Sequence, residues 1–390
     1  MTEPTPVLAL GRDPGGAEAL LPLLEVLERD PGIRLVTYGF DHAHEIFARE
    51  RLAHSAESTS ATDAGRDWDS VGRQLLAASH ARLVITATSF DPGPESGVLR
   101  SARRLGVPTL AVLDQWINYS RRFVRVAGEE IRSEELPDVI AVMDDFAVEE
   151  MIAEGFPAGR LQVVGQAALD RAAQTIGSET ERTQRQAIGR QFGSTAGETL
   201  VVFFSQPLRT LYGRGQERAR GYDEWDTLRG LLEALAVLSQ EGSSPRLAIN
   251  LHPKESTGKF EGLVRGAPFP VTIGASRDAE SLIAVADVVV GMTSITLIKA
   301  FLVEKPVISF QPNLRAPDAL MLGRAGYLDT VTTKEVLLDE LREALGGSRS
   351  PGARPLSPCL RDGRSVARLR SIVRALLVAG ESRPKRLPLI

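Results

Sequence analysis

Residues 286–312 have the sequence ADVVVGMTSITLIKAFLVEKPVISFQP, and this stretch gives the clearest indication of the fold class. The valine-rich run at 287–290 is too short for a helix and is typical of a strand buried on both faces of a parallel sheet. We expect a turn at 291–294, a helix at 295–303 and a second buried strand at 306–310. The stretch is therefore one strand-helix-strand unit.

The turn in this unit carries Gly291, Met292, Thr293 and Ser294. A strand ends there and a helix begins, so unpaired N–H groups, the positive end of the helix dipole and two hydroxyls converge. This combination suits an anionic ligand. The alternative is that Thr293 or Ser294 only caps the helix.

The same alternation of strands and helices runs through the whole chain, which predicts an α/β fold. In the first half we expect strands at 7–11, 33–38, 83–86, 109–113, 139–142 and 161–164, and helices at 17–29, 94–105 and 145–154. In the second half we expect strands at 200–205, 247–251, 271–273, 287–290, 307–310 and 328–331. Two doubly wound, parallel-sheet, Rossmann-like domains that face each other across a ligand cleft are the predicted architecture.

The polar stretch between the two series gives the domain boundaries. We expect a first domain at 1–172, a connection at 173–198 and a second domain at 199–360. The last segment, 361–390, contains an amphipathic helix at 365–378 that is placed to cross back to the first domain.

Two turns of the first half carry candidate acceptor-binding residues. The loop after the first strand holds Asp13, Gly15 and Gly16, but it is neither a G-x-G-x-x-G fingerprint nor a Walker loop. The turns TSFDPGPES (88–96) and LDQWINYSRRF (113–123) also follow strand ends, and they supply Asp91, Asp114, Trp116, Asn118, Tyr119 and Arg122. Aromatic and guanidinium groups suit a sugar-like or phosphorylated acceptor. The alternative is that Trp116 and Tyr119 fasten a long loop to the domain.

Two turns of the second half add polar groups near the Gly291–Ser294 turn. Ser205 and Gln206 end the first strand of this half, and His252 and Lys254 follow the second. A lone histidine is more often structural than functional, but the neighbouring lysine favours phosphate binding here.

Composition excludes several classes of protein. The 390 residues carry a formal net charge of -4, which argues against a protein that depends on neutralising nucleic-acid phosphates. The single cysteine, Cys359, forms no internal disulfide and fits a reducing compartment. We see no signal peptide and no apolar run of membrane-spanning length, so we expect a cytoplasmic protein without integral membrane association.

The order of these motifs resembles the GT-B superfamily, in the branch that contains UDP-N-acetylglucosamine 2-epimerases, lipid A disaccharide synthase and CDP-glycerol glycerophosphotransferases. The resemblance rests on the Gly-Gly turn at 11–16, on DVIAVMDDF and VVGQAALD within 138–170, on INLHPKE at 249–255 and on the stretch at 286–309.

The resemblance implies a nucleotide-diphosphate sugar bound by the second domain and an acceptor bound by the first. It makes Asp13 the candidate catalytic base. Many relatives carry Glu-Ala where this chain has Lys299-Ala300, and a lysine cannot accept hydrogen bonds from ribose hydroxyls. Lys299 would instead add positive charge near a phosphate, and Glu304 is an alternative ribose ligand.

We therefore expect a glycosyltransferase of GT-B type that requires neither metal nor cofactor and acts on a nucleotide sugar. The alternatives are a nucleotide-sugar 2-epimerase or hydrolase, and a non-catalytic binding partner.

Overall fold

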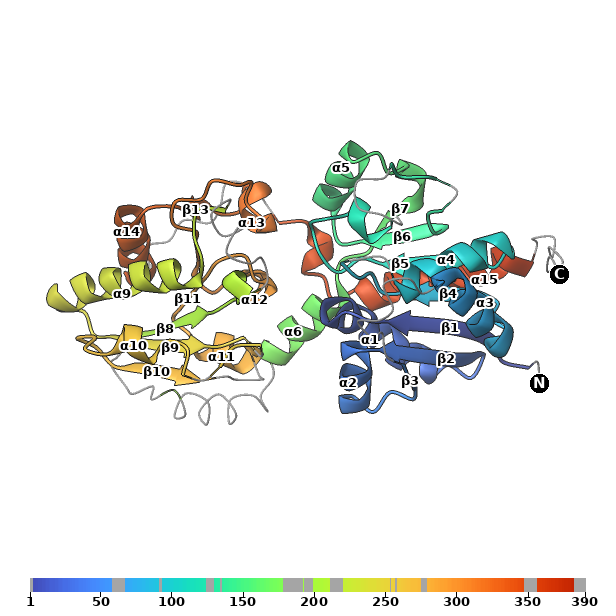
Figure 1. Ribbon diagram of the computed structural model, residues 1–390, viewed down its shortest axis with the longest axis horizontal. Helices are drawn as coiled ribbons and strands as arrows, with labels where there is room; N and C mark the ends of the chain where they lie inside the picture. The colour runs from blue at the N-terminus through green and yellow to red at the C-terminus, as the bar shows by residue number, and fades with distance from the viewer. Residues whose placement is uncertain are drawn as a thin grey trace. The chain divides into compact units, whose positions relative to one another are not determined.

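The computed structural model describes residues 3–57, 67–90, 93–123, 130–133, 135–177, 192, 199–210, 220–252, 254–256, 258–274, 279–346 and 356–381. The chain divides into two compact units (Figure 1). Unit 1 comprises Met1–Arg171 and Ser357–Ile390, and unit 2 comprises Ala172–Leu356. Most of the connection expected at 173–198 lies outside the described residues.

Unit 1 contains a parallel sheet of seven strands in the order β3-β2-β1-β4-β5-β6-β7. The strands are β1 (Thr5–Gly11), β2 (Ile33–Phe40), β3 (Ser55–Glu57), β4 (Leu83–Thr86), β5 (Thr109–Val112), β6 (Val139–Val142) and β7 (Leu161–Val163). The helices are α1 (Pro14–Glu28), α2 (His42–Arg49), α3 (Trp68–Ser79), α4 (Pro94–Arg104), α5 (Asp145–Ala153), α6 (Ala167–Gly177), which crosses the unit boundary, and α15 (Ser365–Glu381).

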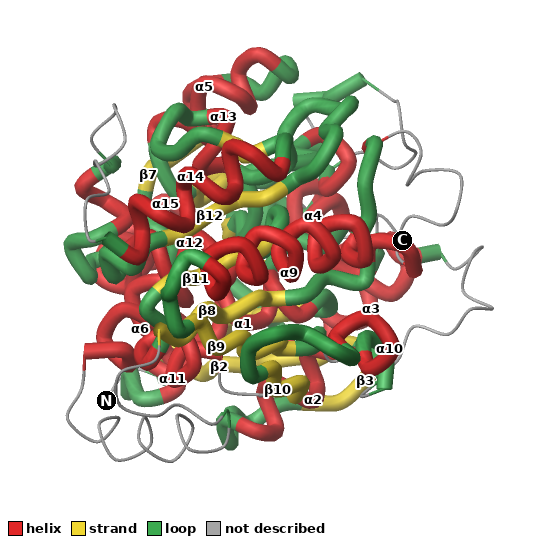
Figure 2. The backbone as a smooth tube through the Cα atoms, turned by 90° about the vertical axis from the view of Figure 1, so that its left-hand side faces the viewer, coloured by secondary structure: helices red, strands yellow, loops and turns green. Residues whose placement is uncertain are grey.

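Unit 2 contains a parallel sheet of six strands in the order β10-β9-β8-β11-β12-β13. The strands are β8 (Thr199–Phe204), β9 (Pro245–Asn250), β10 (Val271–Gly274), β11 (Val288–Gly291), β12 (Val307–Phe310) and β13 (Thr330–Val331). The helices are α9 (Glu224–Gln240), α10 (Glu261–Val264), α11 (Ala279–Val285), α12 (Ile295–Leu302), α13 (Met321–Arg324) and α14 (Lys334–Leu345). The predicted α/β fold with two doubly wound parallel sheets is confirmed. Figure 2 shows the helices in red and the strands in yellow.

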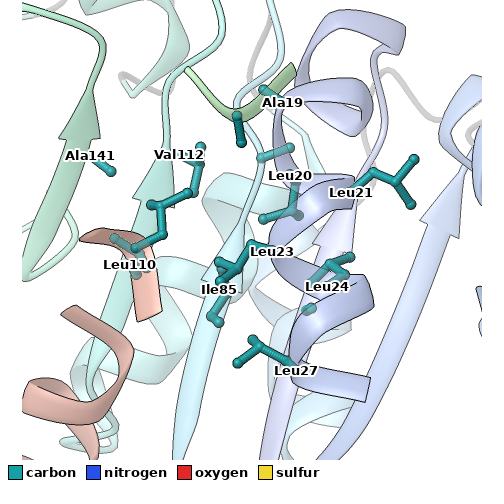
Figure 3. Close-up of a cluster of buried hydrophobic side chains, with 14 of the residues drawn as sticks. Ala19, Leu20, Leu21, Leu23, Leu24, Leu27, Ile85, Leu110, Val112 and Ala141 are labelled. Atoms are coloured by element: carbon teal, nitrogen blue, oxygen red, sulfur yellow. The ribbon is translucent and has the colours of Figure 1, made fainter. Parts of the chain in front are cut away.

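The core of unit 1 is built from leucines of α1 and aliphatic residues of the central strands. Leu20 and Leu23 of α1 lie with Ile85 of β4 and Leu110 of β5 (Figure 3). Leu369 of α15 belongs to the same cluster, so a helix from the end of the chain completes the core of the first unit. All four residues of β4 are buried, so both faces of this strand are covered. This explains why the apolar residues of β4 follow one another without polar residues between them.

The core of unit 2 follows the same rule. Val201 and Phe203 of β8 and Val288 and Val290 of β11 are fully buried, and α9 contributes leucines such as Leu231. Burial on both faces again accounts for the valine-rich sequence. The structure thus places β8 and β11 at the centre of the sheet.

Candidate functional site

Each sheet has a switch point, where successive strands are added to opposite sides of the first strand. It lies between β1 and β4 in unit 1 and between β8 and β11 in unit 2. Open α/β sheets bind ligands beyond the carboxyl ends of the strands at such a point. The turns that follow these four strands are therefore the places to look for binding groups.

The turn after β11 is capped as the sequence suggests. Ser294 is the N-cap of α12, and its Oγ atom accepts the N–H of Thr296 at 3.2 Å. Gly291 is closely packed, because a Cβ atom there would lie 3.1 Å from Leu297 Cδ2. The side chain of Met292 is fully buried, so this residue has only its backbone to offer a ligand.

Gln206 joins the two turns at this switch point. Its Oε1 atom accepts the N–H of Thr293 at 2.8 Å, so that N–H is already used. The N–H groups of Ser294 and Ile295 have no acceptor among the described residues. Since the first N–H groups of a helix have no partner within it, these two are the donors that the turn presents.

The turn after β9 places His252 and Lys254 at the neighbouring strand end. Burial lowers the pKa of His252, and the negative charge of Glu255 opposes that shift. His252 is therefore neutral near pH 7. Lys254 is exposed, so its ammonium group is available to an anion.

Glu255, which we did not single out from the sequence, organises this corner. Its buried carboxylate accepts the hydroxyl of Ser205 at 2.9 Å and the backbone N–H of His252 at 2.8 Å. Lys259 lies 2.6 Å from the same carboxylate and also pairs with the buried Glu224. Because the Ser205 hydroxyl donates to Glu255, it has no proton left for a phosphate, contrary to the expected role of Ser205 as a donor. The sequence H-P-K-E at 252–255 was the feature from which the role of Glu255 in this turn could have been recognised.

Lys299 does not provide an unpaired charge at the Gly291–Ser294 turn. Its Nζ atom lies 2.5 Å from Oε1 of Glu280, and both side chains are largely buried. Glu304 lies two residues beyond the last residue of α12, at the opposite end from Ser294, and the eight residues of that helix span about 12 Å at 1.5 Å per residue. Neither Lys299 nor Glu304 therefore brings an unpaired charged group to the Gly291–Ser294 turn.

In unit 1, the carboxylate of Asp13 lies at the switch point between β1 and β4. Its Oδ2 atom accepts the N–H of Phe90 at 2.8 Å, and Arg12 Nε lies 3.6 Å from Oδ1. The side chain is 36% exposed. Asp13 is thus held in place yet accessible, as a base would need to be.

Gly15 and Gly16 are required by packing. A Cβ atom on Gly15 would lie 2.6 Å from Asp114 Oδ2, and one on Gly16 would lie 2.5 Å from the carbonyl oxygen of Thr88. The close approach of α1 to the ends of β4 and β5 explains both glycines, so their presence is no evidence for an acceptor.

Asp114 and Arg122 form a buried pair with Thr88. Arg122 Nη1 lies 2.7 Å from Asp114 Oδ1, which also accepts the Thr88 hydroxyl at 2.9 Å. Burial raises the pKa of Asp114, while Arg122 opposes that shift. Because the charges of Asp114 and Arg122 neutralise each other, the pair stabilises the loops that follow β4 and β5.

The side chains of Trp116 and Tyr119 are each only 2% exposed, so the structure favours the alternative in which they fasten the loop. Trp116 Nε1 donates to Oδ1 of Asp144, the N-cap of α5, at 3.0 Å, and the Tyr119 hydroxyl donates to Glu150 at 2.7 Å. The expectation that these rings stack on an acceptor is wrong, because their faces are covered. Asn118 is exposed with φ at 57°, a backbone conformation that asparagine tolerates.

An accessible aromatic ring is found instead at Phe90, which we did not select from the TSFDPGPES turn. Its side chain is 39% exposed, and the guanidinium of Arg121 lies 4.1 Å from the ring centroid. The other large exposed hydrophobic side chains of the described residues are on helices. Phe90 and Arg121 thus provide the aromatic ring and the guanidinium group that we expected to find together in the turn at 113–123. Asp91 lies outside the described residues.

Glu95 is a second carboxyl group behind Asp13. It is buried in the first turn of α4 and accepts the hydroxyl of Ser89 at Oε1, while Oε2 has no hydrogen-bond partner in the part of the chain that the structure describes. Burial raises the pKa of Glu95, and Arg12 and Ser89 oppose the shift. No sequence signal distinguished this glutamate from a helix-capping residue.

Two further features, a metal-binding cluster and a membrane-spanning helix, are absent from the described ranges. No group of three or more His, Cys, Asp or Glu side chains is arranged there to hold a metal ion. Among the helices within those ranges, none is both long and apolar enough to cross a bilayer.

No protein-family model and no curated protein matches the sequence. Solved structures do match. The UDP-GlcNAc 2-epimerase of Neisseria meningitidis bound to UDP-GlcNAc has a TM-score of 0.67 at 11% identity, and the match covers 95% of this chain and 99% of that one. The Methanocaldococcus jannaschii UDP-GlcNAc 2-epimerase has a TM-score of 0.66 at 14% identity, with 95% and 99% covered.

A third match is the UDP-N-acetylglucosamine 2-epimerase of Rickettsia bellii, with a TM-score of 0.60, 15% identity and 97% of each chain covered. Identities this low are evidence of the fold and not of the reaction. The chain therefore has the GT-B-like fold of these epimerases, built from two Rossmann-like domains.

Proposed function

We propose that this chain is an enzyme that binds a nucleotide-diphosphate sugar, and that its first candidate reaction is the 2-epimerisation of a UDP-N-acetylhexosamine. One observation carries the proposal: the fold of UDP-GlcNAc 2-epimerases extends over at least 95% of the chain in the matches described above. The epimerase, our earlier alternative, thus replaces the glycosyltransferase as first candidate.

The groups that would hold the diphosphate are in unit 2. The N–H groups of Ser294 and Ile295 lie at the start of α12, where the helix dipole favours an anion. Lys254 and His252 follow the neighbouring β9. Neutral N–H donors and one exposed ammonium are sufficient to bind phosphate oxygens without a metal ion.

Asp13 is the proposed acid-base group of unit 1, because among the residues described at that switch point its carboxylate is both held by hydrogen bonding and exposed. Epimerisation at a carbon that bears hydrogen removes a proton from one face and returns one to the other. The carboxylate of Asp13 would exchange a proton on one face as acid or base, and water or a second acid-base group would have to exchange a proton on the opposite face.

The test combines binding with exchange. UDP is titrated into the purified chain by calorimetry, and UDP-GlcNAc is then incubated with the chain in D₂O and followed by proton NMR. We expect UDP to bind, deuterium to enter at C2 and the 2-epimer to appear. Absence of UDP binding would contradict nucleotide recognition, and binding without deuterium exchange would contradict the epimerase.

A glycosyltransferase is the second candidate, because Asp13 and the exposed ring of Phe90 are also what an acceptor sugar would need. It predicts that UDP binds and that UDP-GlcNAc alone gives no exchange, while UDP is released when a panel of acceptor sugars is added. A non-catalytic partner predicts binding and no turnover in either assay. Substitution of Asp13 by Asn should abolish turnover under both enzyme hypotheses and leave UDP affinity within about twofold, because it removes a carboxylate and none of the N–H and ammonium groups proposed to hold the diphosphate.

A further inference from the structure

The turn that follows β9 is closed by three hydrogen bonds between its residues, two of which are reciprocal. The backbone N–H of His252 donates to Glu255 Oε2 at 2.8 Å, and the N–H of Glu255 donates to the carbonyl oxygen of His252 at 2.8 Å. The N–H of Lys254 donates to Nδ1 of the His252 imidazole at 3.1 Å. This is the logic of a helix capping box, with an imidazole nitrogen in place of the usual hydroxyl oxygen.

The third bond decides where the imidazole carries its proton. Nδ1 accepts an N–H, so it must have its lone pair, and in a neutral imidazole the proton then lies on Nε2. A protonated ring would carry hydrogen at both nitrogens and would lose the bond from Lys254. The turn therefore stabilises one of the three possible states of the side chain, the neutral Nε2–H tautomer.

Buried partners fix Glu255, and with it the turn. Besides His252, its carboxylate binds the hydroxyl of Ser205 at 2.9 Å and Lys259 at 2.6 Å. Lys259 is itself paired with the buried Glu224. A rotation of the Glu255 side chain would leave several of these groups without partners in the interior, which is costly.

We propose that the His252-x-x-Glu255 turn makes His252 a fixed N–H donor to an oxyanion, the phosphate of a nucleotide diphosphate, and that His252 is not a general base. A general base needs an unprotonated nitrogen that faces the substrate, whereas here Nδ1 is occupied and Nε2 carries the proton. Glu255 is a positioning residue in this scheme, because it acts on the ligand only through His252. The choice of ligand rests on the proposed function, but the tautomer does not.

The tautomer is tested by ¹⁵N NMR of the full-length chain, without any need for turnover. The chain has five histidines, and the spectrum of His252→Gln identifies the resonances of His252. We expect the nitrogen shifts of the Nε2–H tautomer near neutral pH. The Nδ1–H tautomer, or an even mixture of the two, would overturn the proposal.

One variant at Glu255 and one at Ser205 distinguish a role of Glu255 in positioning the His252 imidazole from a role in the stability of the fold alone. Glu255→Gln keeps the size of the side chain but places an amide where His252, Ser205 and Lys259 all donate, so we expect the two tautomers to mix. Ser205→Ala removes one bond to Glu255 and none within the turn, so the Nε2–H tautomer should persist. If the tautomer is the same in both variants, Glu255 does not position the imidazole.

The donor role is tested by UDP binding, measured calorimetrically for two variants whose folding is verified by thermal melting. A glutamine at position 252 retains an N–H₂ donor at about the reach of Nε2, whereas alanine retains none. We expect His252→Ala to weaken UDP binding about tenfold and His252→Gln to weaken it by less than about threefold.

Equal weakening by glutamine and alanine would overturn the donor role. Failure of UDP to bind the unaltered chain would overturn both the ligand assignment and the proposed function. The NMR result would then decide the state of His252 by itself, so the two failures are distinguishable.

Discussion

The Oε1 atom of Gln206 accepts the backbone N–H of Thr293 at 2.8 Å and thereby ties the end of β8 to the turn after β11. The amide also contacts the Thr293 hydroxyl, with Nε2 3.3 Å from Oγ1. The side chain therefore serves the shape of the switch point in unit 2 even before a ligand is considered.

Gln206→Ala should lower the free energy of unfolding by about 1 kcal/mol, because a partly buried N–H loses its acceptor. It should also weaken UDP binding, since the turn that presents the N–H groups of Ser294 and Ile295 is no longer held. Urea unfolding and calorimetry measure the two effects. The control is Gln240→Ala at the exposed end of α9, which we expect to change stability by less than about 0.5 kcal/mol. An unchanged stability in Gln206→Ala would contradict the bracing role.

Trp116→Phe should destabilise the chain by about 1–3 kcal/mol and leave nucleotide-sugar turnover unchanged. The substitution removes the N–H that Asp144 accepts at 3.0 Å, and Asp144 is fully buried. Chemical unfolding gives the first quantity and the NMR assay gives the second. The opposite result, in which stability is retained while turnover or binding is lost, would restore Trp116 as a ligand-binding residue.

Glu95→Gln should change how stability depends on pH. Burial raises the pKa of Glu95, so the folded state holds a proton that the unfolded state releases at lower pH. The unaltered chain therefore loses stability as pH rises above the ordinary glutamate value of about 4.3, and glutamine at this position has no such loss. The stability of Glu95→Gln relative to the unaltered chain should grow between about pH 4 and pH 7, measured by urea unfolding.

The matched control for that series is Glu149→Gln on the exposed side of α5, which makes the same substitution without removing a buried carboxyl group. Parallel pH curves for the unaltered chain and Glu95→Gln would show that Glu95 is ionised normally in the fold.

His252→Gln should remove an acid sensitivity of the opposite sign. Burial lowers the pKa of His252, helped by Lys254 and Lys259 and opposed by Glu255, so the unfolded state takes up a proton first as pH falls. Stability of the unaltered chain should therefore fall as pH drops below the ordinary histidine value of about 6.5. Unfolding curves between about pH 5 and pH 8 measure it. An equal loss in His252→Gln would assign the effect to other groups.

The strands were predictable wherever both faces of the sheet are covered. The runs at β4, β6 and β12 are short, mostly apolar and wholly buried, and their bounds agree with the sequence pattern. β3 was not predicted, because Ser55–Glu57 is an exposed edge strand with no apolar residue larger than alanine. The helix expected from 17 begins at Pro14, since proline is accepted in the first turn.

The sequence predicts which residues lie at the candidate site, but not which side chains form hydrogen bonds and ion pairs with one another. Strand ends and turns identify which polar residues reach a switch point, because chain order and sheet type fix that edge. They do not reveal that Ser205 donates to Glu255 or that Lys299 pairs with Glu280, because such partners lie up to 50 residues apart in sequence. For the same reason the sequence does not show that Trp116 is buried against Asp144, or that Phe90 is the exposed ring beside Arg121.

The assignment of α15 to unit 1 bears on how the chain is made. Leu369, Val373 and Leu376 complete the apolar cluster that α1 and β4 begin, yet unit 2 lies between them in sequence. A ribosome therefore has to translate all of unit 2 before it can supply the last layer of the first core. Until α15 has been made, the apolar residues of α1 and β4 that it packs against are without that cover, and uncovered apolar surface of this kind favours aggregation.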